Sequence, residues 1–178
     1  LLAGLYAEGP TAVTEPKLSR NHTELMLKFF GADVHTSDTT ATVLPANELY
    51  GNKIHVPGDI SSSVYFVAAG LIIPNSEILI KNVGINPTRD GLIRVCRAMG
   101  ADITLLNENH DYSEPTADIL VRTSNLKGTV IEGDIIPAMI DELPTVALMA
   151  CFAEGTTRER EFATESSVPI SISLTPAR

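Results

Sequence analysis

Residues Ser19–Val34, SRNHTELMLKFFGADV, and residues Thr88–Ile103, TRDGLIRVCRAMGADI, follow one plan and decide the fold. Each stretch opens with a hydroxyl residue and an arginine and continues with an apolar stripe at helical spacing. Each then reaches a glycine, which is typical of a helix end, followed by the start of a strand. Two such stretches in one chain indicate a repeated supersecondary unit.

The segments before these stretches repeat as well. Ala3-Gly4-Leu5 and a strand at Thr11–Thr14 correspond to Ala69-Gly70-Leu71 and a strand at Glu77–Ile80, and a third copy begins at Leu148. Each unit therefore reads as helix, strand, hydroxyl-Arg loop, helix, glycine and paired strands. Helices that alternate with strands predict an α/β fold of stacked βαβ-type units. Between the first two units, Ile54-His55-Val56 predicts one more strand before a Pro-Gly turn.

The third copy stops where its hydroxyl-Arg helix is due. From Arg158 the chain reads RERE and then FATESSVPISISLTPAR, which has no apolar helical stripe. We predict that residues 158–178 form a disordered tail that is foreign to the fold. Because the chain starts on Leu1 in the middle of the pattern, we also expect it to be the inside of a longer protein.

Composition limits the possible partners and compartment. The 178 residues are 44% hydrophobic, which is enough for a real core, and no apolar run reaches the length of a membrane span. The net charge is −9 without a Lys/Arg cluster, which argues against nucleic acid as a partner. Cys96 and Cys151 lie in apolar helical patterns, so we expect buried free thiols in a reducing, cytoplasmic setting.

Residues 136–154, IPAMIDELPTVALMACFAE, place two adjacent carboxylates in an almost wholly apolar run. Asp141 can cap the helix that follows Pro144 or lie in a solvated loop, and it can equally be a functional acid. For Glu142 the expectation is a supporting or surface carboxylate.

Two arginines mark candidate anion sites. Arg20 and Arg89 lie at the starts of their helices, beside free backbone N–H groups, with Ser19 and Thr88 as additional donors. The alternative is an exposed arginine next to a capping hydroxyl, and repetition does not make both copies functional.

Seven segments in fixed order resemble the family of 5-enolpyruvylshikimate-3-phosphate synthases, the enolpyruvyl transferases of the shikimate pathway. The segments that carry the resemblance are LLAGLYAEG at 1–9, SRNHTELML at 19–27 with GAD at 31–33, VPGDISS at 56–62, NPTRDG at 86–91, MGAD at 99–102, MIDELP at 139–144 and AEGTT at 153–157. They match well under half of the family's chain.

The resemblance implies an α/β fold of repeated βαβαββ units, in which two domains each hold three units around inward helices, an inside-out barrel that is incomplete here. Because VPGDISS corresponds to the crossover between the domains, residues 1–56 are expected in one domain and 57–157 in the other. The implied reaction moves the enolpyruvyl group of phosphoenolpyruvate to the 5-hydroxyl of shikimate 3-phosphate and releases phosphate. The family requires neither a metal nor an organic cofactor.

Three site residues follow from the resemblance. Asp141 matches the family's proton-accepting aspartate, which also contacts the substrate, and Arg20 with Ser19 beside it matches a shikimate 3-phosphate site. The family's N-terminal Lys-Ser and Arg, its Ser-Ala-Gln segment, the Lys-Glu…Arg segment after AEGTT and its C-terminal arginines and lysine are absent. We therefore predict that this chain does not turn over alone.

Two alternatives remain at this point. UDP-N-acetylglucosamine enolpyruvyl transferases share the fold and the chemistry implied above, although SRNHTE and PGDISS favour the shikimate enzymes. A non-catalytic α/β repeat module that binds an anion or a protein is the other. The family's full-length chain is expected to be monomeric, whereas unpaired sheet edges and apolar faces can let this chain self-associate.

Overall fold

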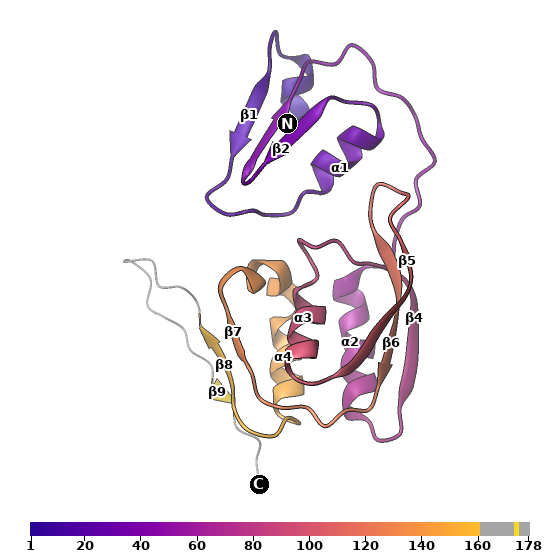
Figure 1. Cartoon of the computed structure of the whole chain (residues 1–178), viewed down its shortest axis with the longest axis vertical. Coiled ribbons are helices and arrows are strands. Elements are labelled where there is room, and N and C mark those ends of the chain that lie inside the picture. The colour runs from indigo at the N-terminus through magenta and orange to yellow at the C-terminus, as the bar shows by residue number, and fades with distance from the viewer. Residues whose placement is uncertain (161–172, 175–178) are drawn as a thin grey trace.

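The computed structural model describes residues 1–160 and 173–174, which form two lobes joined by an extended linker (Figure 1). The N-terminal lobe contains η1 (Leu2–Tyr6), β1 (Thr11–Thr14), α1 (His22–Phe29), β2 (Val34–Ser37) and β3 (Thr40–Val43). The C-terminal lobe begins with α2 (Ile60–Ile72), β4 (Glu77–Gly84), α3 (Gly91–Ala98), β5 (Asp102–Asn109) and β6 (Thr116–Arg122). The two sets of elements have the same order, which confirms the predicted repeat.

Both sheets also share one topology. Their strand orders are β1-β3-β2 and β4-β6-β5, and every pairing within them is antiparallel. The first and second strands of each unit are therefore parallel and are separated by the third strand. Each unit is a split βαβ motif, in which α1 or α3 makes the crossover.

Glycines explain the repeated sequence in physical terms. Gly31 and Gly100 follow α1 and α3 with φ of 92° and 78°, in the left-handed region where glycine is favoured. Upstream, a Cβ on Gly4 would lie 2.6 Å from the Val43 side chain, and a Cβ on Gly70 would collide with Val121. Glycine at these two positions lets the first helix of each unit lie against the unit's third strand.

The rest of the C-terminal lobe consists of β7 (Val130–Glu132), η2 (Gly133–Ile135), η3 (Pro137–Glu142), α4 (Leu143–Ala150), β8 (Thr157–Arg160) and β9 (Ser173–Leu174). Strand β8 pairs in parallel with β7, so residues 158–160 of the expected tail belong to a strand. Apart from β9, the remainder of that tail lies outside the described residues. In Figure 1 the helices of this lobe lie between the β4-β6-β5 sheet and the β7-β8 strands.

Each lobe has its own hydrophobic core. The small N-terminal core consists of Leu5, Leu27, Ala32, Val34 and Val43. The larger core extends from Ile60 to Ala153 and includes fully buried residues of α2, β6 and α4, among them Leu71, Ile119 and Met149. Among the described residues, no helix combines the length and apolar character that a membrane span requires.

The strand expected at Ile54–Val56 is wrong. These residues form the extended linker, and all three are exposed. The β-branched Ile54 and Val56 suit a strand, but no strand among the described residues pairs with this segment. The chain becomes part of the C-terminal lobe at Gly58, whose N–H donates to the Asn82 carbonyl at 2.6 Å.

Candidate active site

A cavity of about 780 Å³ lies between the two lobes. The N-terminal lobe contributes residues 16–20 and Thr39, while the C-terminal lobe contributes Pro87, Thr88, Arg94 and parts of η3. The hydroxyl-Arg loops of both repeats therefore face the same space. A cavity of this size accommodates a small molecule.

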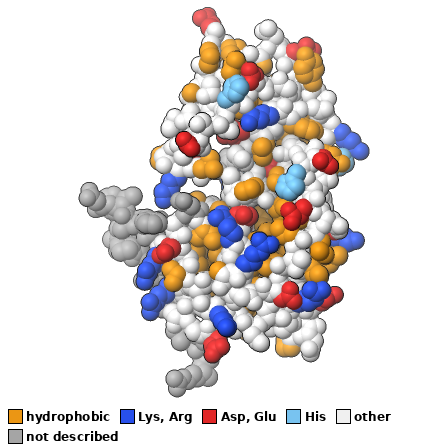
Figure 2. Space-filling view, viewed as in Figure 1, with side chains coloured by type: hydrophobic (Ala, Val, Ile, Leu, Met, Phe, Trp, Pro, Cys, Tyr) orange, Lys and Arg blue, Asp and Glu red, His pale blue; other side chains and the backbone are white. Residues whose placement is uncertain are grey.

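Basic side chains line the cavity, and two of them pair with carboxylates. Lys17, Arg20 and Arg94 line it, and no acidic side chain occurs among its described lining residues. Figure 2 shows Lys and Arg side chains on the C-terminal lobe just below its junction with the N-terminal lobe, with Asp and Glu side chains beside them. Arg20 pairs with Asp141 at 3.0 Å and Arg94 pairs with Asp90 at 2.7 Å, so a ligand anion competes with these carboxylates for the guanidinium groups.

Arg20 and Asp141 meet across the lobes. An Arg20 guanidinium nitrogen donates to Asp141 Oδ2 at 3.0 Å, and the two side chains remain 47% and 55% exposed. Asp141 lies in η3 and is not the residue that precedes α4, which is Glu142, so it does not cap that helix. Its carboxylate is accessible to a ligand, at the rim of a basic cavity.

Ser19 already binds a carboxylate. Its backbone N–H and its hydroxyl donate to the two oxygens of Glu15 at 2.9 and 2.6 Å. The hydroxyl bond, followed by the backbone bond, lowers the pKa of the exposed Glu15 carboxyl. The pair of donors at Ser19 is therefore arranged to hold an anionic oxygen pair, and a ligand anion must displace Glu15 to use it.

A comparison with known proteins places the chain in a family. The model of the family described as EPSP synthase (3-phosphoshikimate 1-carboxyvinyltransferase) matches residues 1–164. The chain belongs to the EPSP synthase family.

Relatives and a solved structure agree with this assignment. The chain is 53% identical over 161 residues to the 3-phosphoshikimate 1-carboxyvinyltransferase of Pelobacter propionicus, covering 90% of this chain and 37% of that protein. It is 54% identical over 157 residues to that of Geobacillus kaustophilus, covering 88% and 37%. The structure of EPSP synthase from Acinetobacter baumannii superposes with a TM-score of 0.85 at 44% identity, over 90% of this chain and 37% of that chain. The chain thus spans little more than a third of the length of these relatives.

Family membership confirms the expected α/β fold of enolpyruvyl transferase units, and the relatives reported above carry the name of the shikimate enzyme. Of the three site residues inferred from the resemblance, Ser19 and Arg20 line the cavity and Asp141 reaches it through Arg20. The second arginine, Arg89, does not line it. Arg89 instead donates to the Ser61 hydroxyl at 2.5 Å and lies 3.6 Å from Asp59.

Glu142 is a buried supporting carboxylate, one of the two alternatives expected for it, but its partners were not predicted from the sequence. Its side chain is almost fully buried, accepts a short hydrogen bond from the Ser61 hydroxyl and lies 3.9 Å from Arg89. It therefore ties η3, which carries Asp141, to the start of α2 and to the loop before α3. The available signal was an acidic residue in an apolar run, which requires a buried partner.

Asp59 completes this cluster as the N-cap of α2. Its carboxylate accepts from the Ser61 and Ser62 N–H groups at 3.3 and 2.9 Å. Partial burial raises the pKa of Asp59, but the hydrogen bonds from Ser62 and Ser61 and the Arg89 charge outweigh burial and lower it overall. The serine row at 61–63 thus supports the helix start and the Glu142 contact.

The cysteines differ from expectation. Cys96 is buried, and desolvation raises the pKa of its thiol to about 12. Cys151 is exposed at the end of α4, so the prediction that both are buried is wrong for this residue. Its helix is short and turns this face away from the core. Among the described residues, no group of three or more His, Cys, Asp or Glu side chains is arranged to hold a metal ion.

Proposed function

We propose that this chain contributes part of the site for the reaction for which its family is named, the transfer of the enolpyruvyl group of phosphoenolpyruvate to the 5-hydroxyl of shikimate 3-phosphate, and that it does not turn over alone. The single observation that carries the proposal is the Arg20–Asp141 contact of 3.0 Å at the rim of a basic cavity between two lobes. This contact places the Arg20 guanidinium and the accessible Asp141 carboxylate close enough for one substrate molecule to bind both.

In this proposal Arg20 and Ser19 bind shikimate 3-phosphate. A guanidinium forms strong charge-assisted hydrogen bonds to phosphate oxygens. Asp141 contacts the substrate and accepts the proton of the 5-hydroxyl as its oxygen forms the new C–O bond, while phosphate leaves from the enolpyruvyl donor.

The separate cores support a second part of the proposal. We infer that residues 1–56 and 57–157 belong to two different domains, since one hydrophobic cluster ends at Ala46 and the other begins at Ile60.

Free cysteines fit a cytoplasmic location, and the net charge of −9 gives no support to a nucleic-acid partner.

An amide NMR titration of this chain with shikimate 3-phosphate tests the binding step. We expect shifts at Ser19, Arg20 and Asp141, and a Kd at least about tenfold weaker in Arg20→Ala, because a charge-assisted hydrogen bond is lost. Arg97→Ala is the matched control, since Arg97 is an exposed arginine at the end of α3 that does not line the cavity.

Asp141→Asn separates binding from proton transfer. Removing the carboxylate charge relieves repulsion with the phosphate and frees Arg20, so affinity for shikimate 3-phosphate should stay equal or rise. UDP-N-acetylglucosamine serves as the competing substrate and should produce no shifts. Saturating shikimate 3-phosphate without any shift around these residues would sink the proposed binding role.

A further inference from the structure

The tip of the β5–β6 hairpin, residues 110–115, contacts both the linker and the N-terminal lobe. The hairpin extends from the sheet of the C-terminal lobe along the linker toward α1 (Figure 1). Its tip therefore lies where the orientation of the two lobes is determined. We refer to residues 110–115 as the hairpin tip.

Glu114 makes the contact with the N-terminal lobe. Its carboxylate accepts from Asn86 Nδ2 at 2.9 Å and lies 2.6 Å from Nδ1 of His22, the first residue of α1. The Glu114 side chain is only 13% exposed. A carboxylate at a helix N-terminus is also stabilised by the helix dipole.

Asn86 connects the same lobes a second time. It is 3% exposed, and its Nδ2 also donates to Asn21 Oδ1 at 2.9 Å. Asn21 precedes α1 but makes no side-chain cap for that helix, since its side-chain oxygen bonds the other lobe instead. A buried amide bonded to two lobes ties them together, because separation leaves polar groups without partners.

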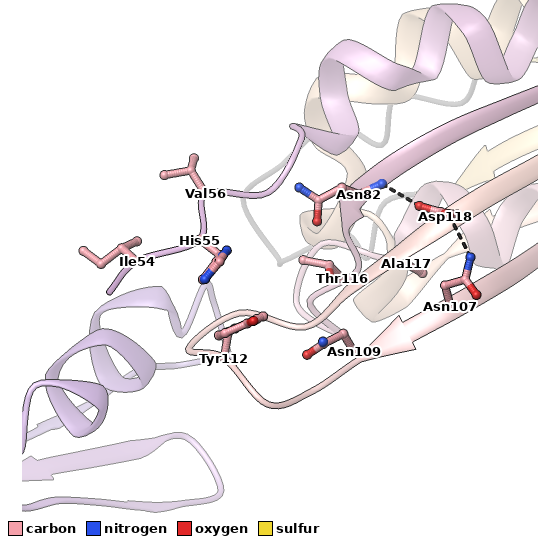
Figure 3. Close-up of a pocket in the computed structure, with 10 residues that line it drawn as sticks. All are labelled: Ile54, His55, Val56, Asn82, Asn107, Asn109, Tyr112, Thr116, Ala117 and Asp118. Carbon is pink, nitrogen blue, oxygen red and sulfur yellow. Dashed lines mark hydrogen bonds between the residues drawn. The ribbon is translucent and has the colours of Figure 1, made fainter. Parts of the chain in front are cut away.

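Tyr112 contacts the linker. Its ring stacks on the ring of His55 with centroids 4.2 Å apart and planes at 28°, and Figure 3 shows the two rings facing each other. A pocket of about 410 Å³ separates the rest of the linker from the sheet. The ring pair thus joins the linker to the hairpin tip, on the surface that Figure 3 shows.

Two irregularities shape the hairpin. Register shifts occur between Ile80 and Val83 and between Leu106 and Asn109. In these bulges Asn82 and Asn107 adopt positive φ of 53° and 51°, and both donate to Asp118, at 2.8 and 2.9 Å. Bulges bend strands and increase their twist, so one carboxylate holds the bend that directs the hairpin tip.

We propose that the hairpin tip is a clasp that fixes the orientation of the two lobes and that Glu114 is the positioning residue for Arg20. Arg20 lies two residues before His22, so the clasp holds the start of α1 in the place where Arg20 reaches Asp141. This inference concerns the lobes themselves and holds whatever anion the cavity binds.

Distance measurements between spin labels test the clasp. One label is attached to the exposed native Cys151 and the other to Ser37→Cys on the exposed end of β2, whereas buried Cys96, with its raised thiol pKa, does not react. The labels report one lobe relative to the other. The unsubstituted background should give a single narrow distance distribution.

Glu114→Ala should broaden this distribution and raise the share of undocked molecules about tenfold, the equivalent of one charge-assisted hydrogen bond. Glu108→Ala is the matched control, since Glu108 lies on the same hairpin and its ion pair, 3.5 Å from His110, stays within that hairpin and does not reach the N-terminal lobe. His22→Ala breaks the same contact from the other lobe. The double variant should exceed the stronger single variant only slightly, because both changes remove one interaction.

Amide spectra show whether each lobe is still folded in these variants, and the guanidinium signal of Arg20 reports its contact with Asp141. We expect faster solvent exchange of that guanidinium in Glu114→Ala and no change in Glu108→Ala. A narrow distribution and a protected Arg20 in folded Glu114→Ala or folded His22→Ala would overturn the proposal.

Discussion

Replacing Glu142 with alanine should destabilise the C-terminal lobe far more than the same change at its neighbour Asp141. The two carboxylates are adjacent, but their surroundings are opposite. Glu142 is 2% exposed and bonds Ser61, whereas the Asp141 side chain is 55% exposed and pairs with Arg20. Because both residues carry one carboxylate, the difference between the two variants reports the effect of burial on the free energy of unfolding.

The magnitude follows from what Glu142→Ala leaves behind. Removing one member of a fully buried ion pair costs about 3–5 kcal/mol, and leaving a buried polar partner unsatisfied costs about 1–3 kcal/mol. Arg89 keeps Asp59 at 3.6 Å and is 21% exposed, so water and a second carboxylate reduce its penalty. We expect a loss of about 2–3 kcal/mol for Glu142→Ala, and about 1 kcal/mol for Glu142→Gln, which retains an acceptor for Ser61. Asp141→Ala should cost less than about 1 kcal/mol, as exposed pairs do.

Native-state hydrogen exchange is the suitable assay, because it reports the stability of each lobe separately. Two lobes with separate cores can unfold in separate transitions. Amides of Val67 and Leu71 in α2 report the C-terminal lobe, since both side chains are fully buried. Those of Leu27 and Val43 report the N-terminal lobe and serve as an internal control. Equal effects of Glu142→Ala and Asp141→Ala on the α2 amides would refute the assignment of Glu142 as the buried anchor of η3.

Three further outcomes follow from individual contacts. Gly70→Ala should destabilise the C-terminal lobe by about 1–3 kcal/mol in thermal unfolding, because the added methyl group meets Val121. Asp59→Ala should cost about 1 kcal/mol at pH 7 through loss of the α2 cap. Because the folded-state pKa of Asp59 is lowered, this difference is present above its unfolded pKa of about 3.9 and should vanish as the pH falls through the folded value, which denaturant titrations at several pH values can follow. A thiol reagent at pH 8 should modify Cys151 and spare Cys96 until the chain unfolds, as measured by mass spectrometry.

The repeat could be predicted from the sequence because its signals are local. A helical apolar stripe ending at glycine depends on residues within one turn of each other, and Gly31 and Gly100 adopt the left-handed backbone that such a pattern predicts. The strand expected at Ile54–Val56 failed for the opposite reason. A strand needs a partner edge, and pairing is set by the rest of the chain rather than by the segment itself.

The sequence predicts the individual residues of the site but not the contact between them, because that contact also depends on distant parts of the chain. Arg20 and Asp141 were inferred singly, one from a helix start and one from an acid in an apolar run, but their separation of 121 positions hides the contact between them. The same holds for the clasp, where Glu114 reaches His22 across 92 positions. Both contacts join the two lobes, so neither can form until the linker has brought them together. If the clasp orients α1 as proposed, the Arg20–Asp141 pair depends on a carboxylate outside the cavity, and a change at the hairpin tip should alter anion binding without touching any lining residue.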